Sequence, residues 1–448
     1  MGQRNFTDGS VLRHILVMSG TSTIGLLAMF GVDLTDLIFL SHLGDPNIIA
    51  AMGFAGVLLF FTQSIGIGLS IAMLAIVSRK LGAKDTDAAK QSATHILTVS
   101  LLIALSLVAL LMPWLELLMM KLGATQTVAD LALSYLKWVF PAFPIMVLAS
   151  SSNAVVRALG DARRAMTMML AGAAVNVVLD PILIFGFDMG IEGAAIASLA
   201  ARLTMAGFAL YAVIKVHDML GRFELSPFLS EASSIIRFAI PTTLTNFATP
   251  VGMALVTYKM AEISTEAVAG SAIISRITPV AFAVFYSLSG AVGPIIGQNF
   301  GAQRYDRVVE TFSASIRFSC AYTVVLWVVM LATTPLLIQL FAAEGEVAEI
   351  VKAFNYYAIP MTCAMGALFV ANAGFNNMGR PVLATLSNFT RNTIGVIPFI
   401  WVGGAYYGGE GVIIGYALGG LICGFISFAF ARHMARQYQF KESTGESK

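Results

Sequence analysis

Long apolar runs, separated by short polar breaks, recur along the whole chain. Ile67–Val77, Ile96–Met112 and Val324–Leu340 are three examples, and with their flanks most runs approach the roughly 20 residues that a membrane-spanning helix needs. The pattern therefore predicts an all-α integral membrane protein with twelve transmembrane helices. Their expected ranges are 15–42, 48–78, 92–116, 127–156, 163–186, 190–216, 236–260, 266–298, 310–341, 347–376, 381–404 and 410–435.

Composition supports a membrane protein and narrows the functional classes. Hydrophobic residues make up 57% of the chain and charged residues only 12%, whereas soluble domains average about 25% charged residues. A net charge of +2, with no basic run interleaved with aromatic residues, excludes nucleic acid as a partner. The three cysteines lie inside apolar segments without metal-ligand spacing, and no catalytic constellation is present. We therefore do not expect an enzyme.

The basic residues predict the orientation of the helices, because lysine and arginine concentrate on the cytoplasmic side of a bilayer. Nineteen of the 27 basic residues, Arg4 and Lys448 included, fall on the side that both termini share. Only Lys121, Lys259 and Lys352 fall in the loops of the opposite side. Both termini are therefore expected in the cytoplasm.

Two pairs of segments resemble each other at one common offset, which indicates an internal duplication. They are Arg79–Asp85 with Gln298–Arg304, and Asn153–Gly160 with Asn372–Gly379, each pair 219 positions apart. A duplicated six-helix unit predicts two bundles related by a pseudo-two-fold axis along the membrane normal, with the substrate path between them. The expected domains are an N-terminal lobe, 1–216, a cytoplasmic linker, 217–234, and a C-terminal lobe, 235–448. The alternative is that the duplication only builds a scaffold.

Only three of the 25 acidic residues, Asp33, Asp36 and Asp180, fall well inside the predicted spans, and all three belong to the first half of the chain. Asp33 and Asp36 are three positions apart on one helix, and Asn176 and Asp180 are four apart on another, so each pair lies on one helix face. A carboxylate at membrane depth costs about 2.5–3.5 kcal/mol, so it is usually protonated, paired or bound to a cation. These groups could hold Na⁺ or share a proton. Alternatively, the acids neutralise arginines within the spans, for which the candidates are Arg202, Arg276 and Arg391.

Several segments, taken together, resemble the multidrug and toxic compound extrusion (MATE) family in its prokaryotic form, over essentially the whole chain. They are Asp36–Gly44, Ser78–Lys84, Arg157–Asp161, Asn176–Pro181 and Gly193–Ala195. The resemblance implies a first-lobe cation site at Asp36, Asn176, Asp180 and Ser198, to which the residue pattern adds Asp33. It also implies a drug chamber lined by Tyr135, Asn153 and Met169.

Two departures from the family pattern qualify these expectations. The predicted helices 236–260 and 347–376 have no acid in their interiors, although some branches carry coupling acids there, so coupling is expected in the first lobe. In this respect the chain resembles the DNA-damage-inducible-protein-F-like branch. The first predicted helix also contains no proline, which puts in doubt a mechanism that bends this helix at a proline.

The resemblance implies a secondary active exporter in the bacterial cytoplasmic membrane. It would antiport organic cations or amphipathic toxins against H⁺ or Na⁺ by alternating access, without a cofactor and as a monomer. A metal is expected only as Na⁺ at Asp36, Asn176 and Asp180. The alternative within transporters is a flippase for lipid-linked oligosaccharides, whose anionic head group would suit Arg276 and Arg391. A receptor or an intramembrane enzyme is the alternative from another class.

Overall fold

The computed structural model describes residues 5–444, which are helical with short connections and contain no strand. Arg4 and Lys448, two of the residues counted toward the cytoplasmic side, lie outside the described residues. The chain divides into two compact units. Unit 1 is Ile24–Thr243, and unit 2 comprises Asn5–Thr23 with the chain from Leu244 onward. The division falls within two helices, α1 (Val11–Ser41) and α9 (Leu225–Ala261). The lobe limits expected from the sequence stay a prediction.

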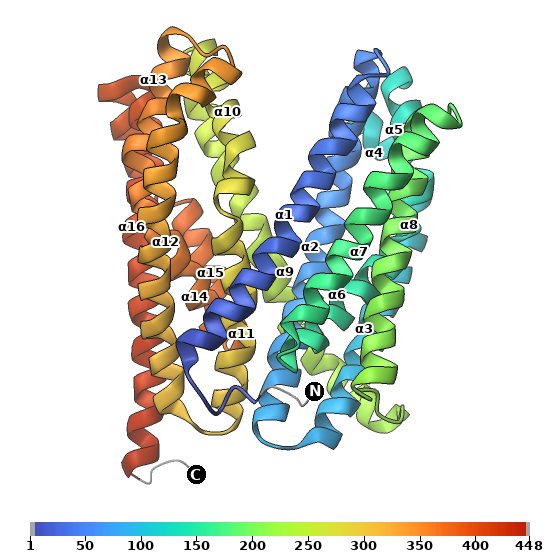
Figure 1. Ribbon diagram of the computed structural model, residues 1–448, viewed down its shortest axis with the longest axis vertical. Helices are drawn as coiled ribbons and strands as arrows, with labels where there is room; N and C mark the ends of the chain where they lie inside the picture. Colours follow the sequence, from blue (N-terminus) through green and yellow to red (C-terminus); the bar gives the residue numbers. More distant parts are fainter. Residues whose placement is uncertain (1–4, 445–448) are drawn as a thin grey trace. The chain divides into compact units, whose positions relative to one another are not determined.

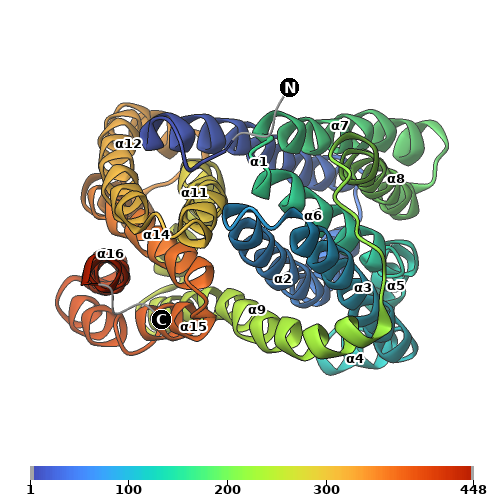
Figure 2. The same cartoon turned by 90° about the horizontal axis from the view of Figure 1, so that it is seen from below.

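Unit 1 is a bundle in which α2 contacts α3 and α6, while α8 contacts α6 and α7 (Figures 1 and 2). Small residues such as Ala72, Ala75 and Ala154 are fully buried in its apolar clusters, and small side chains let membrane helices approach closely. Its elements after α1 are α2 (Pro46–Gly82), α3 (Thr86–Leu111), η1 (Met112–Trp114), α4 (Leu115–Lys121), α5 (Gln126–Val139), α6 (Phe143–Ala158), α7 (Ala162–Pro181), η2 (Ile182–Gly186), α8 (Gly190–Tyr211) and η3 (Ala212–Val216).

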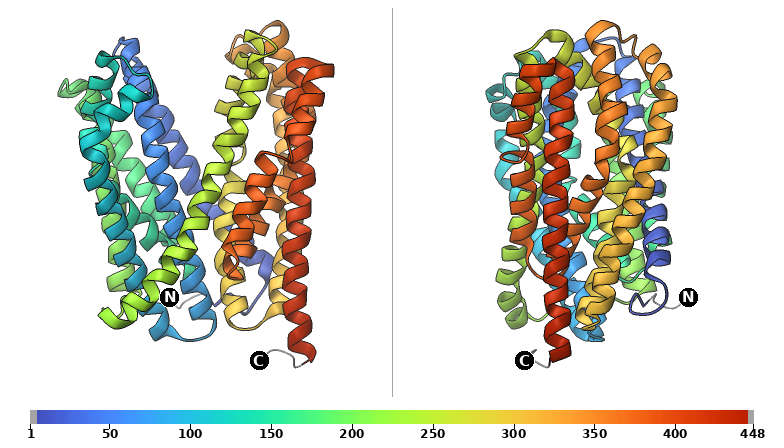
Figure 3. Two further views of the ribbon diagram at one scale, coloured as in Figure 1. Left: turned by 180° about the vertical axis from the view of Figure 1, so that it is seen from behind. Right: turned by 90° about the vertical axis from the view of Figure 1, so that its left-hand side faces the viewer.

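Unit 2 is built around α14, which contacts α11, α12, α15 and α16. The long helices α12 and α16 run beside each other, as Figure 3 shows. Its elements after α9 are α10 (Thr265–Ala281), α11 (Ala283–Gly301), α12 (Tyr305–Leu340), α13 (Gly345–Ala353), η4 (Phe354–Ala358), η5 (Ile359–Thr362), α14 (Cys363–Asn377), α15 (Pro381–Asn392) and α16 (Ile397–Thr444).

Several predicted spans are bent or broken. In the described residues, eight helices are long and apolar enough to cross a membrane, or ten when two bent pairs each count as one span. The pairs α5–α6 and α10–α11 bend by 50° and 43°, and prolines near these breaks, Pro141, Pro144 and Pro279, remove backbone donors. Adding α9, and dividing the last long stretch at the non-helical Tyr407–Gly408, gives the twelve predicted spans. The helix predicted over 381–404 is not continuous in the structure, because turns at 393–396 separate α15 from α16.

The duplication inferred from the sequence is also present in the backbone. Residues with left-handed φ occur in matched pairs 219 positions apart: Lys84 (61°) with Gln303 (59°), and Gly160 (77°) with Gly379 (80°). Helix limits follow the same offset. Gly82 and Gly301 end α2 and α11, Thr86 and Tyr305 begin α3 and α12, and Ala158 and Asn377 end α6 and α14. Equivalent junctions of the two repeats therefore have the same local conformation.

Candidate functional site

Asp36 on α1 and Asp180 on α7 lie together in unit 1, with Asn176 between them. When the amide nitrogen of Asn176 faces the two acids, it donates to Asp36 Oδ1 at 2.9 Å and to Asp180 Oδ2 at 3.2 Å. The amide of Asn176, which has two N–H donors, thus bridges the two carboxyl groups.

Burial makes it costly in free energy for an acid of this cluster to be ionised. Asp180 is fully buried and Asn176 nearly so, whereas Asp36 is half-buried and Asp33 is exposed. Oδ1 of Asp180 accepts no hydrogen bond from any donor in the described part of the chain. A buried carboxylate oxygen without a donor is costly, so this atom is a suitable position for a proton or a cation.

The local structure of α7 directs Asp180 inward. Asn176 and Asp180 are four residues apart and therefore lie on one face of the helix. Pro181 follows immediately and ends the regular helix, because its ring nitrogen cannot donate to the preceding turn. The next five residues, Ile182–Gly186, form a π-helical turn, and such widened turns are frequent at functional sites.

A second group of polar residues adjoins the acids from α5 and α8. The side chains of Tyr135 and Ser198 lie next to each other. Arg202, one turn beyond Ser198, donates to the carbonyl of Val139 at 3.0 Å and interacts electrostatically with Tyr135 and Asp33. Ser198 thus contacts Tyr135, and among the described contacts it has none with the two acids.

The residues expected to line a drug chamber do not form one contact group. Tyr135 adjoins the acid cluster, as described above. Asn153 donates from Nδ2 to the carbonyl of Ala165 at 3.1 Å, and so ties α6 to α7. Met169 lies beneath Gly25 of α1, where an added Cβ atom would approach its sulfur to 2.8 Å. A role of all three residues in binding cargo remains a prediction.

The three arginines proposed as counter-ions lie in different surroundings. Only Arg202 interacts with one of the three membrane acids, Asp33, and no ion pair within 4.0 Å joins those acids to a basic residue of the described chain. Arg276 is exposed, and Arg391 contacts Tyr416. Sequence reasoning named Arg202 only as a counter-ion and missed the contact between Tyr135 and Ser198. The spacing of Ser198 and Arg202, one turn apart, was the available signal.

Metal ligation by side chains of the usual kind is not indicated. Within residues 5–444, no group of three or more histidine, cysteine, aspartate or glutamate residues is arranged to hold a metal ion. The remaining arrangement is the pair of acids with the amide of Asn176, which offers either a nitrogen or an oxygen to whatever lies between the carboxylates. The amide orientation would therefore differ between a shared proton and a bound Na⁺.

An apolar helical chain that is duplicated, with acids buried in its first repeat, defines a multi-pass membrane transporter. The MatE family model matches it twice, over residues 22–182 and 241–402, and the two starting points are again 219 positions apart. The chain belongs to the MATE family, whose members are transporters and not enzymes. This finding confirms the family and the twelve-helix fold that the sequence predicted.

Individual relatives cover nearly the whole chain. An FAD transporter of Shewanella oneidensis is 28% identical over 431 residues, which are 94% of either chain. The multidrug export protein MepA of Staphylococcus aureus is 24% identical over 424 residues, which are 93% of either chain. A crystal structure of a mutant of the Vibrio cholerae MATE transporter VcmN matches with a TM-score of 0.89 at 24% identity, covering 95% of this chain and 97% of that one.

Proposed function

We propose that this protein exports organic compounds in exchange for protons that bind between Asp36 and Asp180. The single observation that carries the proposal is the amide of Asn176, which lies within hydrogen-bond distance of both carboxyl groups and so places them close together. Two acids so close cannot both ionise readily, so the pair takes up a proton in one state and releases it in another. The site would operate in the cytoplasmic membrane of a bacterium, in a monomer with both termini in the cytoplasm.

Coupling follows if the proton and the cargo stabilise different states of the transporter. A ligand shifts a conformational equilibrium only by its differential affinity for the two states. Protonation of the pair removes charge from unit 1 and so weakens its attraction for a cationic cargo. The proton would therefore be bound preferentially in the state that has released the cargo outside.

Sodium is the competing ion, and the two ions would require different orientations of the Asn176 amide. A Na⁺ ion prefers oxygen ligands, so it would require the amide oxygen of Asn176 to face Asp36 and Asp180. A shared proton is compatible with the amide nitrogen in that place. Replacement of Asn176 by aspartate, which offers oxygens without an N–H donor, and by leucine, which removes the polar group, would separate the role of an oxygen ligand from that of a hydrogen-bond donor.

The test is gradient-driven transport of a fluorescent organic cation, ethidium, in everted vesicles. Wild type should move ethidium under an imposed proton gradient, whereas Asp36→Asn and Asp180→Asn should lose most of this transport. Asp188→Asn is a matched control, because Asp188 is exposed and has a left-handed backbone that asparagine tolerates. Transport that follows a sodium gradient alone would replace H⁺ by Na⁺ in the proposal. Normal transport by both mutants under both gradients would refute the carboxylate mechanism.

A flavin nucleotide is a second candidate cargo. A relative that matches 94% of this chain is described as an FAD transporter. Unit 2 contains Arg391, which lies in a predicted span and has no carboxylate partner among the described residues. Such cargo would be anionic, in contrast to the organic cations exported under the first proposal. Transport of FAD from loaded vesicles, compared with transport of ethidium, would measure the preference directly.

A further inference from the structure

Asp33 of α1 is exposed, and its side of the helix faces other helices of unit 1. Leu40 lies seven positions further along α1, which places it on the same side of the helix as Asp33. It is fully buried in an apolar cluster that includes Val139 of α5 and Ala194 of α8. Arg202 of α8 also interacts electrostatically with Asp33. The carboxylate of Asp33 is therefore directed toward α5 and α8, and its exposed atoms reach water on this side of α1.

The three membrane acids of unit 1 differ in their access to water in a graded way. Asp33 is exposed, Asp36 is half-buried and Asp180 is fully buried. Oδ1 of Asp180 meets no donor in the described chain and is a suitable place for a proton, but a fully buried acid can exchange its proton with water only through neighbouring groups. The amide of Asn176 brings Asp36 next to Asp180. Asp36 is therefore the first step of a path to water.

Helical spacing supplies the next step, from Asp36 to Asp33. Residues three positions apart on a helix have Cβ atoms about 5–6 Å apart, so the two carboxyl groups can reach each other directly or through one water molecule. Proton transfer requires this reach, which is about 2.6–3.2 Å between heavy atoms or one bridging water. Asp33, Asp36 and Asp180 thus form a row of acids that begins in water and ends in the interior of unit 1.

The charge of Arg202 suits Asp33 to pass a proton on. Nη1 of Arg202 donates to the carbonyl of Val139 at 3.0 Å, and no ion pair within 4.0 Å joins Asp33 to a basic residue of the described chain. The positive charge therefore attracts the ionised form of Asp33 without covering its oxygens. The other titratable groups that act on Asp33 are Asp36 on the same helix and Tyr135 on α5. A purely structural counter-ion would be expected to form a direct ion pair with Arg202.

We propose that Asp33 transfers protons between water and the pair formed by Asp36 and Asp180. This inference rests on the proposed function as a proton-coupled exporter, and it adds the route by which the coupling proton reaches or leaves the pair. On release, the O–H bond of Asp36 breaks as an O–H bond forms on Asp33. Asp36 is left as a carboxylate, and Asp33 then gives the proton to water. The second repeat lacks all three acids, because the positions 219 residues later hold Gly252, Leu255 and Phe399.

The test measures ethidium transport by the purified full-length protein in liposomes, in two modes. In net transport, an imposed proton gradient drives ethidium across the membrane. In exchange, radiolabelled ethidium on one side replaces unlabelled ethidium on the other without a gradient, so no proton has to be transferred. Asp33→Asn should slow net transport by about tenfold to a hundredfold, somewhat less than a proton-transferring side chain often contributes, because water can replace part of the route. Exchange should stay near the wild-type rate, which would show that the mutant is folded.

Two further substitutions separate proton transfer from the negative charge of Asp33. Asp33→Glu keeps a carboxylate, whereas Asp33→His supplies an imidazole, which passes protons near neutral pH without a negative charge. Both should restore a substantial part of the net transport that Asp33→Asn loses. Restoration by glutamate alone would mean that Asp33 acts as the counter-ion of Arg202 and would overturn the proton route. A higher KM for ethidium in both modes, with an unchanged maximal rate, would make Asp33 a cargo ligand and would equally overturn it.

The result for Asp33 is separable from that for the proposed exporter. Asp188→Asn serves again as the control, because Asp188 is exposed and lies outside this row of acids, and it should keep wild-type rates in both modes. Proton-driven transport by wild type, at an equal rate in Asp33→Asn, would refute the proton route and leave the exporter in place. Loss of both modes in Asp33→Asn would show a structural role and would also refute the route. Absence of proton-driven transport in wild type would refute the proton-coupled exporter itself.

Discussion

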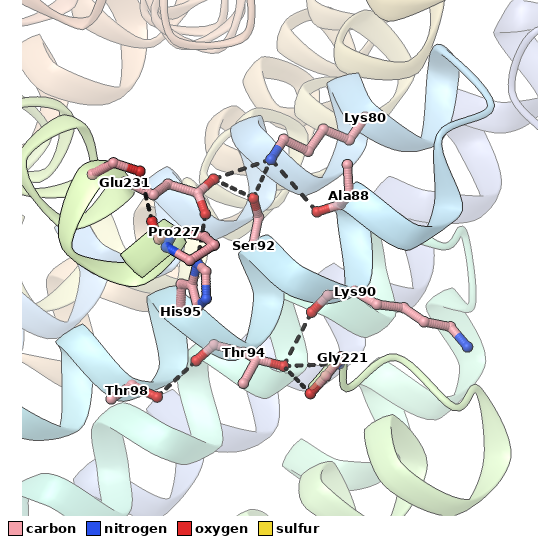
Figure 4. A network of polar contacts seen from close by, with 11 residues as sticks. Lys80, Ala88, Lys90, Ser92, Thr94, His95, Thr98, Gly221, Pro227 and Glu231 are labelled. Carbon is pink, nitrogen blue, oxygen red and sulfur yellow. Dashed lines mark hydrogen bonds and ion pairs between the residues drawn. The ribbon is translucent and has the colours of Figure 1, made fainter. Parts of the chain in front are cut away.

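Glu231, near the start of α9, accepts a hydrogen bond from Nδ1 of His95 on α3, with 2.7 Å between the two atoms. The same carboxylate accepts from Lys80 Nζ at 3.0 Å and from the hydroxyl of Ser92 (Figure 4). Because a carboxylate only accepts, the proton lies on Nδ1 of His95, and Nε2 of this buried ring has no partner in the described chain. Glu231 therefore connects the beginning of α9 to α2 and α3 by hydrogen bonds.

Glu231→Gln is expected to lower the stability of the protein near neutral pH by about 1.5–3 kcal/mol, the usual value of hydrogen bonds to a charged group. Burial tends to raise the pKa of Glu231, but hydrogen bonds from Ser92, His95 and Lys80 together lower this pKa below its ordinary 4.5. A lowered pKa in the folded state means that the ionised group contributes stability above about pH 4.5, and that this contribution is lost as the pH falls through the folded-state pKa.

Thermal unfolding in detergent at pH 7 and at pH 4 measures the effect of Glu231. The gap between wild type and Glu231→Gln should be large at pH 7 and should narrow at pH 4. Glu224→Gln is a suitable control, because Glu224 lies in the same connection and is exposed. An equal loss of stability at both pH values would mean that the charge of Glu231 contributes nothing.

The kink in α16 predicts a strict requirement for glycine. Gly403 and Gly411 lie on either side of Tyr407–Gly408, and a Cβ atom on Gly403 would come within 2.1 Å of the carbonyl oxygen of Gly411. Backbone atoms cannot move aside as a flexible side chain can, so Gly403→Ala should cost about 1–3 kcal/mol of stability. The thermal midpoint of the purified mutant provides the measurement.

Gly207→Ala is the matched control for Gly403→Ala. Gly207 lies within α8, and an added Cβ atom would meet nothing within 4 Å. Alanine favours the helix over glycine, so this mutant should be as stable as wild type or slightly more stable. If Gly403→Ala behaved like the control, the close approach of the two arms of α16 would be wrong.

Phe6, which precedes α1, should contribute strongly to the stability of unit 2. Its side chain is 1% exposed, its N–H donates to Gln298 Oε1 at 2.9 Å, and its carbonyl accepts from Asn299 and Arg307. Phe6→Ala removes a buried aromatic ring and should cost about 3 kcal/mol or more. The rate of proteolytic cleavage before α1, followed by mass spectrometry, should be higher in Phe6→Ala than in wild type.

Leu12→Ala is the control for the loss of Phe6. Leu12 lies in the first turns of α1 and is 43% exposed, so shortening it creates no cavity and should leave cleavage near the wild-type rate. Equal cleavage of both mutants would show that Phe6 does not anchor this segment.

Much of the fold could be predicted from the sequence because membrane helices leave a strong pattern. Apolar length determines the spans, and the 219-residue offset found between short loop segments recurs in helix limits such as Gly82 and Gly301. The breaks were harder to predict. Turns at 393–396 interrupt a stretch that reads as one apolar run, and Gly395 is required there because a Cβ atom would meet the sulfur of Cys423 at 2.3 Å. That contact is between residues distant in sequence.

The candidate site was predictable in part, because charged residues stand out against the apolar pattern of membrane helices. A carboxylate within an apolar run is conspicuous, so Asp36 and Asp180 could be named, and the structure places both within hydrogen-bond distance of the Asn176 amide. Hydroxyl and amide groups are less conspicuous, because they also bond within their own helix. Ser198 proved to be a neighbour of Tyr135, a contact between two helices that helical spacing alone cannot predict.

A chain cut in the connection between η3 and α9 would leave neither fragment with a whole unit. The first fragment would lack Leu225–Thr243, whose Phe228, Ile235 and Phe238 belong to the apolar clusters of unit 1. The second would lack Asn5–Thr23, and with this segment the anchor of Phe6 in unit 2. Each fragment carries the strip of helix that completes the other. We therefore expect each repeat to need the other in order to fold, and co-production of both fragments should restore what neither forms alone.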